Sequence, residues 1–144
     1  MTNEDIVSAK SSMRPRIVLS GEDYDRLSAL ANAAMNRMPD LAARLVEEID
    51  RAHVLAKGTH LEQIVCMNSK VEFRDDSNGK IQKVTLVYPD EADISQLKIS
   101  VLTPVGTALI GLRKGDAITW ETPAGETRQL TVLAIQEHHV PSDA

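Results

Sequence analysis

The first regular pattern along the chain is that of an amphipathic helix. Apolar residues recur at three- and four-residue intervals between positions 24 and 38, as expected when one face of a helix is buried. These residues are Tyr24, Leu27, Leu30, Ala31, Ala34, Met35 and Met38. Ser20 stands where an N-cap is expected, and Glu22 and Asp23 follow in the first turn, where the helix dipole favours negative charge. The apolar residues before Ser20 predict a short extended segment within residues 14–19.

A second helical pattern begins directly after Pro39. Its apolar stripe consists of Leu41, Ala42, Leu45, Val46, Ile49, Ala52 and Ala56. Gly58 predicts the end of this helix. Because only about three residues separate the two patterns, the helices are expected to run antiparallel and to bury their stripes on each other. The seam of this hairpin is predicted at Leu27, Leu30, Leu45, Val46 and Ile49.

From residue 61 onward the apolar residues alternate with polar ones, which is the period of β-strands. Buried strand positions are predicted at Val65, Met67, Val71, Phe73, Val84, Leu86, Tyr88, Ile99, Val101, Ile118, Trp120, Leu130, Val132, Ala134 and Gln136. Turn-forming residues at 75–79, 114–116 and 123–125 separate the strands. Residues 105–112 predict one short helix, bounded by Gly106 and Gly111.

The predicted fold class is therefore α+β. We expect a flexible lead-in over residues 1–14, an antiparallel two-helix coiled-coil hairpin over residues 15–60, and a mostly antiparallel sheet with one short helix over residues 61–140.

Composition narrows the possible functions. The 144 residues carry a net charge of −5, and neither half has the basic excess typical of sequence-independent nucleic-acid binding. The four aromatic residues are spread along the chain and do not predict a stacking platform for single strands. A lone Cys66, no secretory signal and no apolar run of roughly 20 residues together predict a cytoplasmic protein.

No residue pattern predicts a catalytic centre, a cofactor or a metal site. Adjacent His138 and His139 would point to opposite faces of a strand, and Gly58 is expected to end the helix between His53 and His60. Cys66 falls in an alternating strand, where a buried core thiol is expected. The acidic residues at 75–76 and 90–93 fall in turns, where aspartate is favoured for backbone reasons. We therefore expect a protein that is not an enzyme.

Several motifs resemble those of one bacterial family, in the same order. Residues 99–111 (ISVLTPVGTALIG) resemble the I-S-x-x-[ST]-P-x-G-x-A-L-x-G signature of the Gre transcript-cleavage factors, as do the turns at 115–116 (GD) and 122–125 (TPAG). Residues 14–20 (RPRIVLS), 67–71 (MNSKV) and 84–89 (VTLVYP) are similar to the Gre-related regulators of nucleoside diphosphate kinase. The resemblance covers about residues 14–140.

This resemblance implies an FKBP-like fold for residues 61–140 and binding to RNA polymerase at the rim of the secondary channel, with the hairpin pointing inward. The polymerase-binding residues it implies are Leu102, Thr103, Pro104, Val105 and Gly106. The position before Thr103 is often acidic in Gre factors and is Leu102 here, so that polar contact is not available, and the sequence does not decide whether an apolar packing contact takes its place. Independently of the resemblance, Pro104 pre-shapes its loop and Gly106 allows a close backbone approach.

The hairpin tip argues against a cleavage activity. The tip residues are Asn36, Arg37, Met38 and Asp40. Gre hairpins are much longer and carry paired acidic residues that help to hold a catalytic magnesium. Here the predicted helices are only about 24–29 Å long, and Asp40 has an arginine nearby and also suits the first turn of its helix. The prediction is a polymerase-binding regulator without cleavage activity, able to compete with Gre factors.

Two alternatives remain open from the sequence. The FKBP-like fold raises a peptidyl-prolyl isomerase, although such an enzyme uses an aromatic-rich cleft and the sheet part has only Phe73, Tyr88 and Trp120. A two-helix hairpin also pairs readily into a four-helix bundle, which raises a self-associating structural protein. The expected partner set is RNA polymerase without a membrane or strong direct nucleic-acid binding, and the expected state is a monomer or weak dimer.

Overall fold

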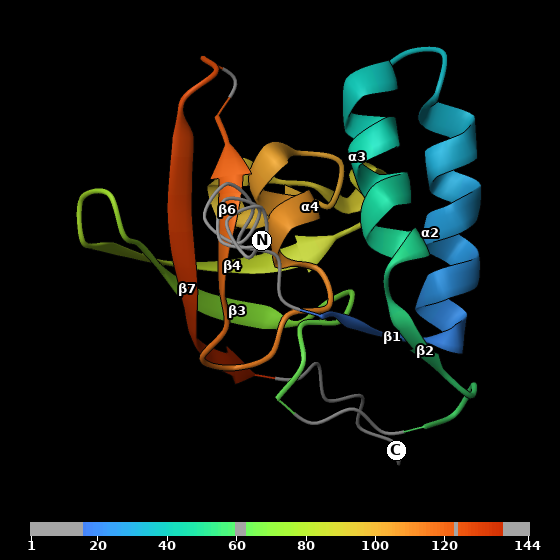
Figure 1. Ribbon diagram of the computed structural model, residues 1–144, viewed down its shortest axis with the longest axis horizontal. Helices are drawn as coiled ribbons and strands as arrows, with labels where there is room; N and C mark the ends of the chain where they lie inside the picture. The colour runs from blue at the N-terminus through green and yellow to red at the C-terminus, as the bar shows by residue number, and fades with distance from the viewer. Residues whose placement is uncertain (1–15, 60–62, 123, 137–144) are drawn as a thin grey trace, which may run out of the picture.

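Two antiparallel helices precede a five-stranded sheet in the computed structural model (Figure 1), which describes residues 16–59, 63–122 and 124–136. A short strand β1 (Val18–Ser20) leads into α2 (Gly21–Ala34), and α3 (Pro39–Asp50) follows. The Ser20 side chain accepts a hydrogen bond from the Asp23 N–H at 3.1 Å, which confirms the predicted N-cap. Within the described ranges, no helix is long and apolar enough to cross a membrane.

The second helix ends earlier than predicted. The sequence pattern extends it to Gly58, but α3 stops at Asp50 and His53–Leu55 form strand β2, which pairs in parallel with β1. The His53 N–H donates to the Ile17 carbonyl at 2.9 Å. Because a strand partner is available, these backbone groups form hydrogen bonds between distant segments, and Ala52 and Ala56 do not lie on a helix.

The sheet follows a mixed topology with mostly antiparallel neighbours. Its strands are β3 (Lys70–Asp75), β4 (Lys80–Val87), β5 (Lys98–Ser100), β6 (Ala117–Glu121) and β7 (Thr127–Gln136), arranged in the order β5-β4-β3-β7-β6. Among the described strands of this sheet, only the β4–β5 pair is parallel, and the 3₁₀ turns η1 (Pro89–Glu91) and η2 (Ile94–Gln96) connect these two strands. The α+β class is confirmed, and the FKBP-like description stays a prediction.

A bulge changes which side chains of β7 face the core. Glu72 pairs with Ala134 and Phe73 with Val132, so Leu133 is an extra residue in the ladder. Leu130 and Val132 are buried as predicted, but the next buried position is Ile135. The inward placement predicted for Ala134 and Gln136 is wrong, since both are exposed.

The segment before β3 is a loop, where alternation predicts a strand. Val65 and Met67 are buried, as predicted, although neither lies in a strand. Cys66 lies between them and is only half-buried, with its N–H donating to the Ser69 hydroxyl at 2.9 Å. The expectation of a buried thiol in a strand is therefore wrong.

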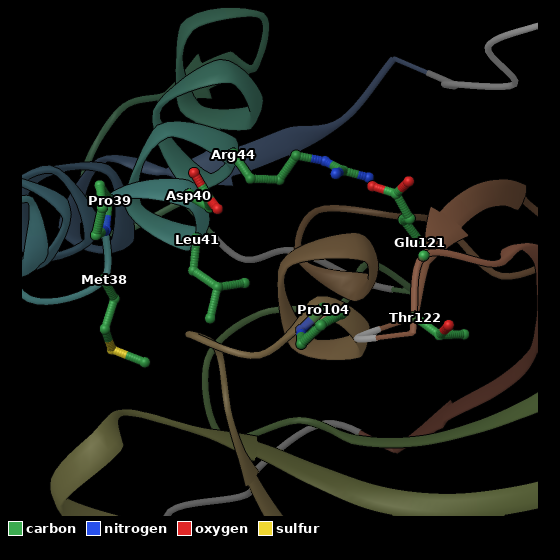
Figure 2. A pocket seen from close by; sticks show the side chains of 9 residues that line it. Met38, Pro39, Asp40, Leu41, Arg44, Pro104, Glu121 and Thr122 are labelled. Carbon is green, nitrogen blue, oxygen red and sulfur yellow. The ribbon is translucent and has the colours of Figure 1, made fainter.

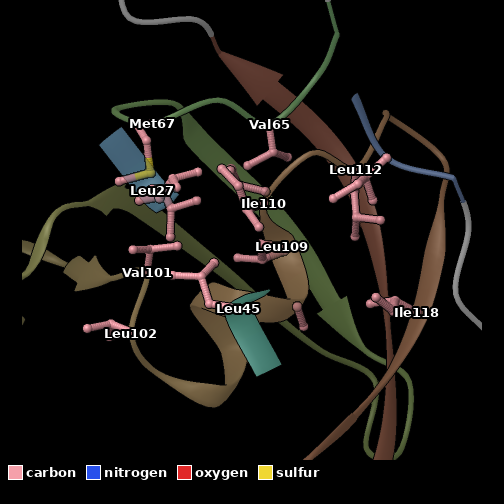
Figure 3. Close-up of a cluster of buried hydrophobic side chains, with 14 of the residues drawn as sticks. Leu27, Leu45, Val65, Met67, Val101, Leu102, Leu109, Ile110, Leu112 and Ile118 are labelled. Carbon is pink, nitrogen blue, oxygen red and sulfur yellow. The ribbon is translucent and has the colours of Figure 1, made fainter. Parts of the chain in front are cut away.

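The hairpin and the sheet share one hydrophobic core. The short helix α4 (Pro104–Leu109) contacts both α3 and β6. Figure 3 shows Leu27 of α2 and Leu45 of α3 entering the same cluster as Val101, Leu109 and Ile110, and all five are at most 1% exposed. Of the predicted hairpin seam, Leu27, Leu45 and Ile49 are buried, while Leu30 and Val46 are partly buried against this core. The apolar stripes of the hairpin thus cover the sheet part as well as each other.

Candidate functional site

The loop between β5 and α4 is held in shape by its own side chains. The Thr103 hydroxyl donates to the Ser100 carbonyl at 2.8 Å and accepts the Gly106 N–H at 3.0 Å, so it caps α4. The Ser100 hydroxyl accepts the Leu102 N–H at 2.9 Å. Pro104 is the first residue of the helix, where a missing N–H costs nothing. The loop is therefore a preformed surface on a rigid support.

Gly106 allows the close backbone approach predicted from its position. A Cβ there would stand 2.8 Å from the Val101 Cα and still closer to the Ser100 carbonyl oxygen, so no side chain fits. Gly106 lies inside α4, so the prediction that it bounds the helix is wrong. Gly111 does follow the helix, with a φ of +82°.

The five loop residues differ in how exposed they are, and therefore in whether a partner can contact them. Leu102 is 5% exposed and belongs to the core, and Gly106 is also buried. Thr103, Pro104 and Val105 are half-buried and form the accessible part of the loop. Leu102 therefore holds the loop against the core and offers little surface to a partner.

The hairpin tip lies beside this loop. Asn36, Arg37, Met38 and Asp40 are all exposed, and Asp40 occupies the first turn of α3. Met38 and Asp40 share a groove of about 540 Å³ with Pro104. In Figure 2, Arg44 extends from α3 toward Glu121 on the far side of this groove. The tertiary structure thus brings together the two groups of residues singled out in the sequence.

The helices of the hairpin are shorter than predicted. With 14 and 12 residues, they are about 21 Å and 18 Å long. The predicted lengths of about 24–29 Å are wrong, because residues 35–37 form a turn after α2 and the residues expected to extend α3 form β2.

A second groove, here called the α2 groove, lies between α2 and the segment that joins β4 to β5. It has a volume of about 640 Å³, and its lining includes Arg26, Leu30, Arg37, Tyr88, Asp90 and Leu102. The Arg26 guanidinium lies 4.2 Å from the centroid of the Tyr88 ring, a cation–π contact. The Tyr88 hydroxyl is buried and has no hydrogen-bond partner within the described ranges. Burial, with Asp23 nearby, raises the pKa of Tyr88 to about 12.

Asp23 links α2 to the sheet part close to this groove. Its carboxylate accepts the Met67 N–H at 3.2 Å, a contact across 44 positions of sequence. Burial raises the pKa of Asp23 despite that hydrogen bond and the nearby Arg26. Sequence reasoning assigned Asp23 to the first turn of the helix and Tyr88 to the core. The unpaired Tyr88 hydroxyl has no sequence signal, because its surroundings come from distant segments.

A third groove of about 380 Å³ lies on the sheet and is mainly apolar. Phe73, Ile99, Val105 and Trp120 are among its lining residues. Tyr88 lines the α2 groove instead, so the aromatic residues of the sheet part do not converge on one cleft. The three aromatic residues of the sheet part therefore do not together form the aromatic-rich cleft that a peptidyl-prolyl isomerase uses.

The remaining candidate groups do not form a reactive site. His53 is exposed in β2, whereas His60, His138 and His139 lie outside the described residues. Over the described part of the chain, no three His, Cys, Asp or Glu side chains gather as a possible metal site. Asp75 is only 4% exposed and its carboxylate accepts hydrogen bonds from Ser77 and Arg128, so it is not the solvated turn residue that the sequence predicts.

Comparison with known proteins matches both parts of the chain. Residues 60–137 match the family model described as transcription elongation factor GreA/GreB, C-terminal, and residues 15–55 match the one described as the Rnk N-terminus. The regulator of nucleoside diphosphate kinase of Escherichia coli K12 is 38% identical over 85% of this chain and 90% of its own length. The transcription inhibitor protein Gfh1 of Thermus aquaticus is 34% identical over 81% of this chain and 74% of its own length.

A solved structure agrees with these sequence matches. The prokaryotic transcription elongation factor GreA/GreB from Nitrosomonas europaea superposes with a TM-score of 0.66 at 36% identity, covering 85% of this chain and 99% of that one. The fold, the order of the sequence motifs and the two family-model matches all indicate the same family. The chain therefore belongs to the GreA/GreB transcription elongation factor family, and it shares its N-terminal part with the regulators of nucleoside diphosphate kinase.

Proposed function

We propose that this protein is a regulator, not an enzyme, that binds RNA polymerase at the rim of the secondary channel, does not promote transcript cleavage and competes with Gre factors. The observation that carries the proposal is the position of the hairpin tip. The tip shares a groove with Pro104 of the loop, so both belong to one docking surface. Because the tip lies next to the loop, the hairpin does not project far beyond the sheet part that is proposed to dock on the polymerase.

The chemistry of the tip supports the same conclusion. Magnesium in an active centre is held by carboxylates with near-octahedral geometry. Asp40 is the only carboxylate among the tip residues 35–40, and Arg37 lies three positions before it, in the turn between the two helices. A positive charge near a single carboxylate opposes metal binding. The dipole of α3 is a sufficient reason for an aspartate at this position.

The structure also bears on self-association. A four-helix bundle needs the apolar stripes of two hairpins to face each other. Leu27 and Leu45 are fully buried against the sheet part, so their stripe is already covered. Binding to another protein is therefore favoured over pairing through the hairpin seam.

The first test is direct binding of the full chain to core RNA polymerase, followed by competition with a Gre factor. The double variant Thr103→Arg and Pro104→Ala should bind at least about tenfold more weakly, because interface centres carry most of the affinity. Arg113→Glu, in an exposed turn outside the grooves described, is the control. Full affinity in the double variant would place the interface elsewhere.

The second test uses backtracked elongation complexes. The protein should not accelerate release of short RNA 3′ fragments, and it should slow the release caused by a Gre factor. Asp40→Ala should behave like the wild type in both measurements. Faster release by this protein, abolished in Asp40→Ala, would show a working cleavage factor and contradict the proposal.

A further inference from the structure

The hairpin tip carries two exposed methionines. Met35 and Met38 are 39% and 37% exposed, whereas Met67, the other methionine within the described ranges, is 7% exposed. A thioether that solvent can reach is open to oxidation, while a buried one is protected by the atoms packed around it. The tip therefore presents two methionines to an oxidant in solution, and Met67 provides a buried reference in the same chain.

The two exposed methionines differ in their position relative to the proposed docking surface. Met38 lines the groove of about 540 Å³ that contains Pro104, together with the apolar side chain of Leu41. In Figure 2 the Met38 side chain extends from the tip on the same side as Leu41. Met35 lies in the turn after α2 and lines neither this groove nor the α2 groove. Similar exposure and different position make Met35 a matched control for Met38.

Oxidation changes the Met38 side chain from apolar to polar. Its sulfur lone pair bonds to one oxygen of hydrogen peroxide, the O–O bond breaks, and the leaving hydroxide takes the remaining proton and departs as water. The thioether loses two electrons to the peroxide and becomes a sulfoxide. Leu41 and Pro104 have no side-chain donor for the new oxygen, and Arg44 extends toward Glu121 instead. The sulfoxide would therefore lose hydration on docking without gaining a hydrogen bond from these neighbours.

We propose that Met38 is an oxidation site through which peroxide weakens docking on RNA polymerase, and that reduction of the sulfoxide restores docking. This inference rests on the proposed function, because it places Met38 inside the surface that docks. The reverse step needs a thiol-dependent methionine sulfoxide reductase, in which two thiols become a disulfide and the sulfoxide oxygen leaves as water.

The test measures binding of the full chain to core RNA polymerase before and after treatment with hydrogen peroxide. The peroxide is removed, and a thiol reductant then returns Cys66 to its reduced form without reducing sulfoxides. Trypsin cleaves after Arg37, so mass spectrometry reports Met35 and Met38 in separate peptides. Met38 should oxidise at least about fivefold faster than Met67. The oxidised chain should bind about tenfold more weakly, and methionine sulfoxide reductase should restore its affinity.

Two variants assign the effect to one sulfur atom. Leucine is close to methionine in volume and has no sulfur to oxidise. Met38→Leu should have the same affinity before and after peroxide, whereas Met35→Leu should still lose about tenfold. Far-UV circular dichroism of the oxidised wild type should match that of the untreated protein, because the side chain that changes lies at the surface.

The outcomes separate this inference from the proposed function. Unchanged affinity of a wild-type chain that carries the Met38 sulfoxide would overturn the inference and leave the proposed function intact. An equal loss of affinity in oxidised Met38→Leu would assign the effect to another residue and overturn the inference as well. A loss of helical signal on oxidation would attribute weaker binding to unfolding, with the same consequence. No binding by the untreated wild type would overturn both.

Discussion

The two ends of β4 differ in how their polar side chains are satisfied. At its start, in the turn from β3, Asp75 accepts hydrogen bonds from the Ser77 N–H and hydroxyl and from Arg128, at 2.6–3.0 Å. Asp76 accepts from Thr131, Arg74 and Gln129 at 2.6–3.1 Å. Just beyond the other end, the Tyr88 hydroxyl is buried without a partner in the described residues.

This difference separates a hydrogen-bonded polar cluster from a hydroxyl that is buried by packing alone. Buried polar groups are usually hydrogen-bonded, so the network around Asp75 and Asp76 needs no external ligand to explain it. At the Tyr88 end, the hydroxyl is enclosed by packing, and no hydrogen-bond partner for it lies within the described residues. Acidic residues in a sequence suggest candidate chemistry, yet here Asp75 and Asp76 stabilise a turn.

The largest expected effect tests whether both ends of β4 depend on one core. Leu45→Ala should lower the free energy of unfolding by about 2–5 kcal/mol, because it leaves a cavity where a fully buried side chain packs. In a urea titration, far-UV circular dichroism and Trp120 fluorescence should lose signal together. Ala43→Ser, at an exposed position of α3, is the control. Separate transitions for helix and sheet, or an unchanged midpoint, would show that the hairpin is not part of a shared core.

An intermediate effect is expected at the turn from β3 to β4. Asp76→Ala should cost about 1–3 kcal/mol, since it leaves the Thr131 hydroxyl and Arg74 without their acceptor. Thermal unfolding of this variant near neutral pH measures the loss. A midpoint equal to that of the wild type would mean that the network is a surface arrangement with little energetic value.

The same carboxylates make stability depend on pH. Hydrogen bonds from Ser77, helped by Arg128, lower the pKa of Asp75, and at Asp76 the donors Thr131 and Arg74 outweigh burial and also lower the pKa. A lowered pKa means that the stabilisation is present above the ordinary value of about 3.9 and is lost as the pH falls through the folded value. The variant Asp75→Asn with Asp76→Asn should flatten this acid-side loss. An unchanged acid profile in the double variant would assign the effect to other groups.

The smallest effect is expected at the other end of β4. Tyr88→Phe should change the free energy of unfolding of the isolated protein by no more than about 0.5 kcal/mol, because the hydroxyl that it removes makes no hydrogen bond there. Urea denaturation without polymerase measures it. A loss above about 1 kcal/mol would reveal an internal partner for the hydroxyl and remove the contrast between the two ends.

Local patterns predicted the elements of this protein well. The cap at Ser20, the turn at residues 75–79, the short helix after Pro104 and the close approach at Gly106 all depend on near neighbours in the chain. Each is decided by side-chain hydrogen bonds or steric space within a few residues, which a sequence displays directly. The α+β class follows from the change of period near residue 61.

Other features depended on contacts between distant segments. Helix α3 ends at Asp50 because the next residues pair with β1, and Ile135 faces the core because of a bulge opposite Glu72 and Phe73. The position of the hairpin tip beside Pro104 and the unpaired hydroxyl of Tyr88 likewise arise from packing between segments far apart in sequence. The sequence by itself determined the two helices, most of the strands and the turns between them. Only the tertiary structure decided what those elements face, because burial and hydrogen-bond partners are properties of the assembled core.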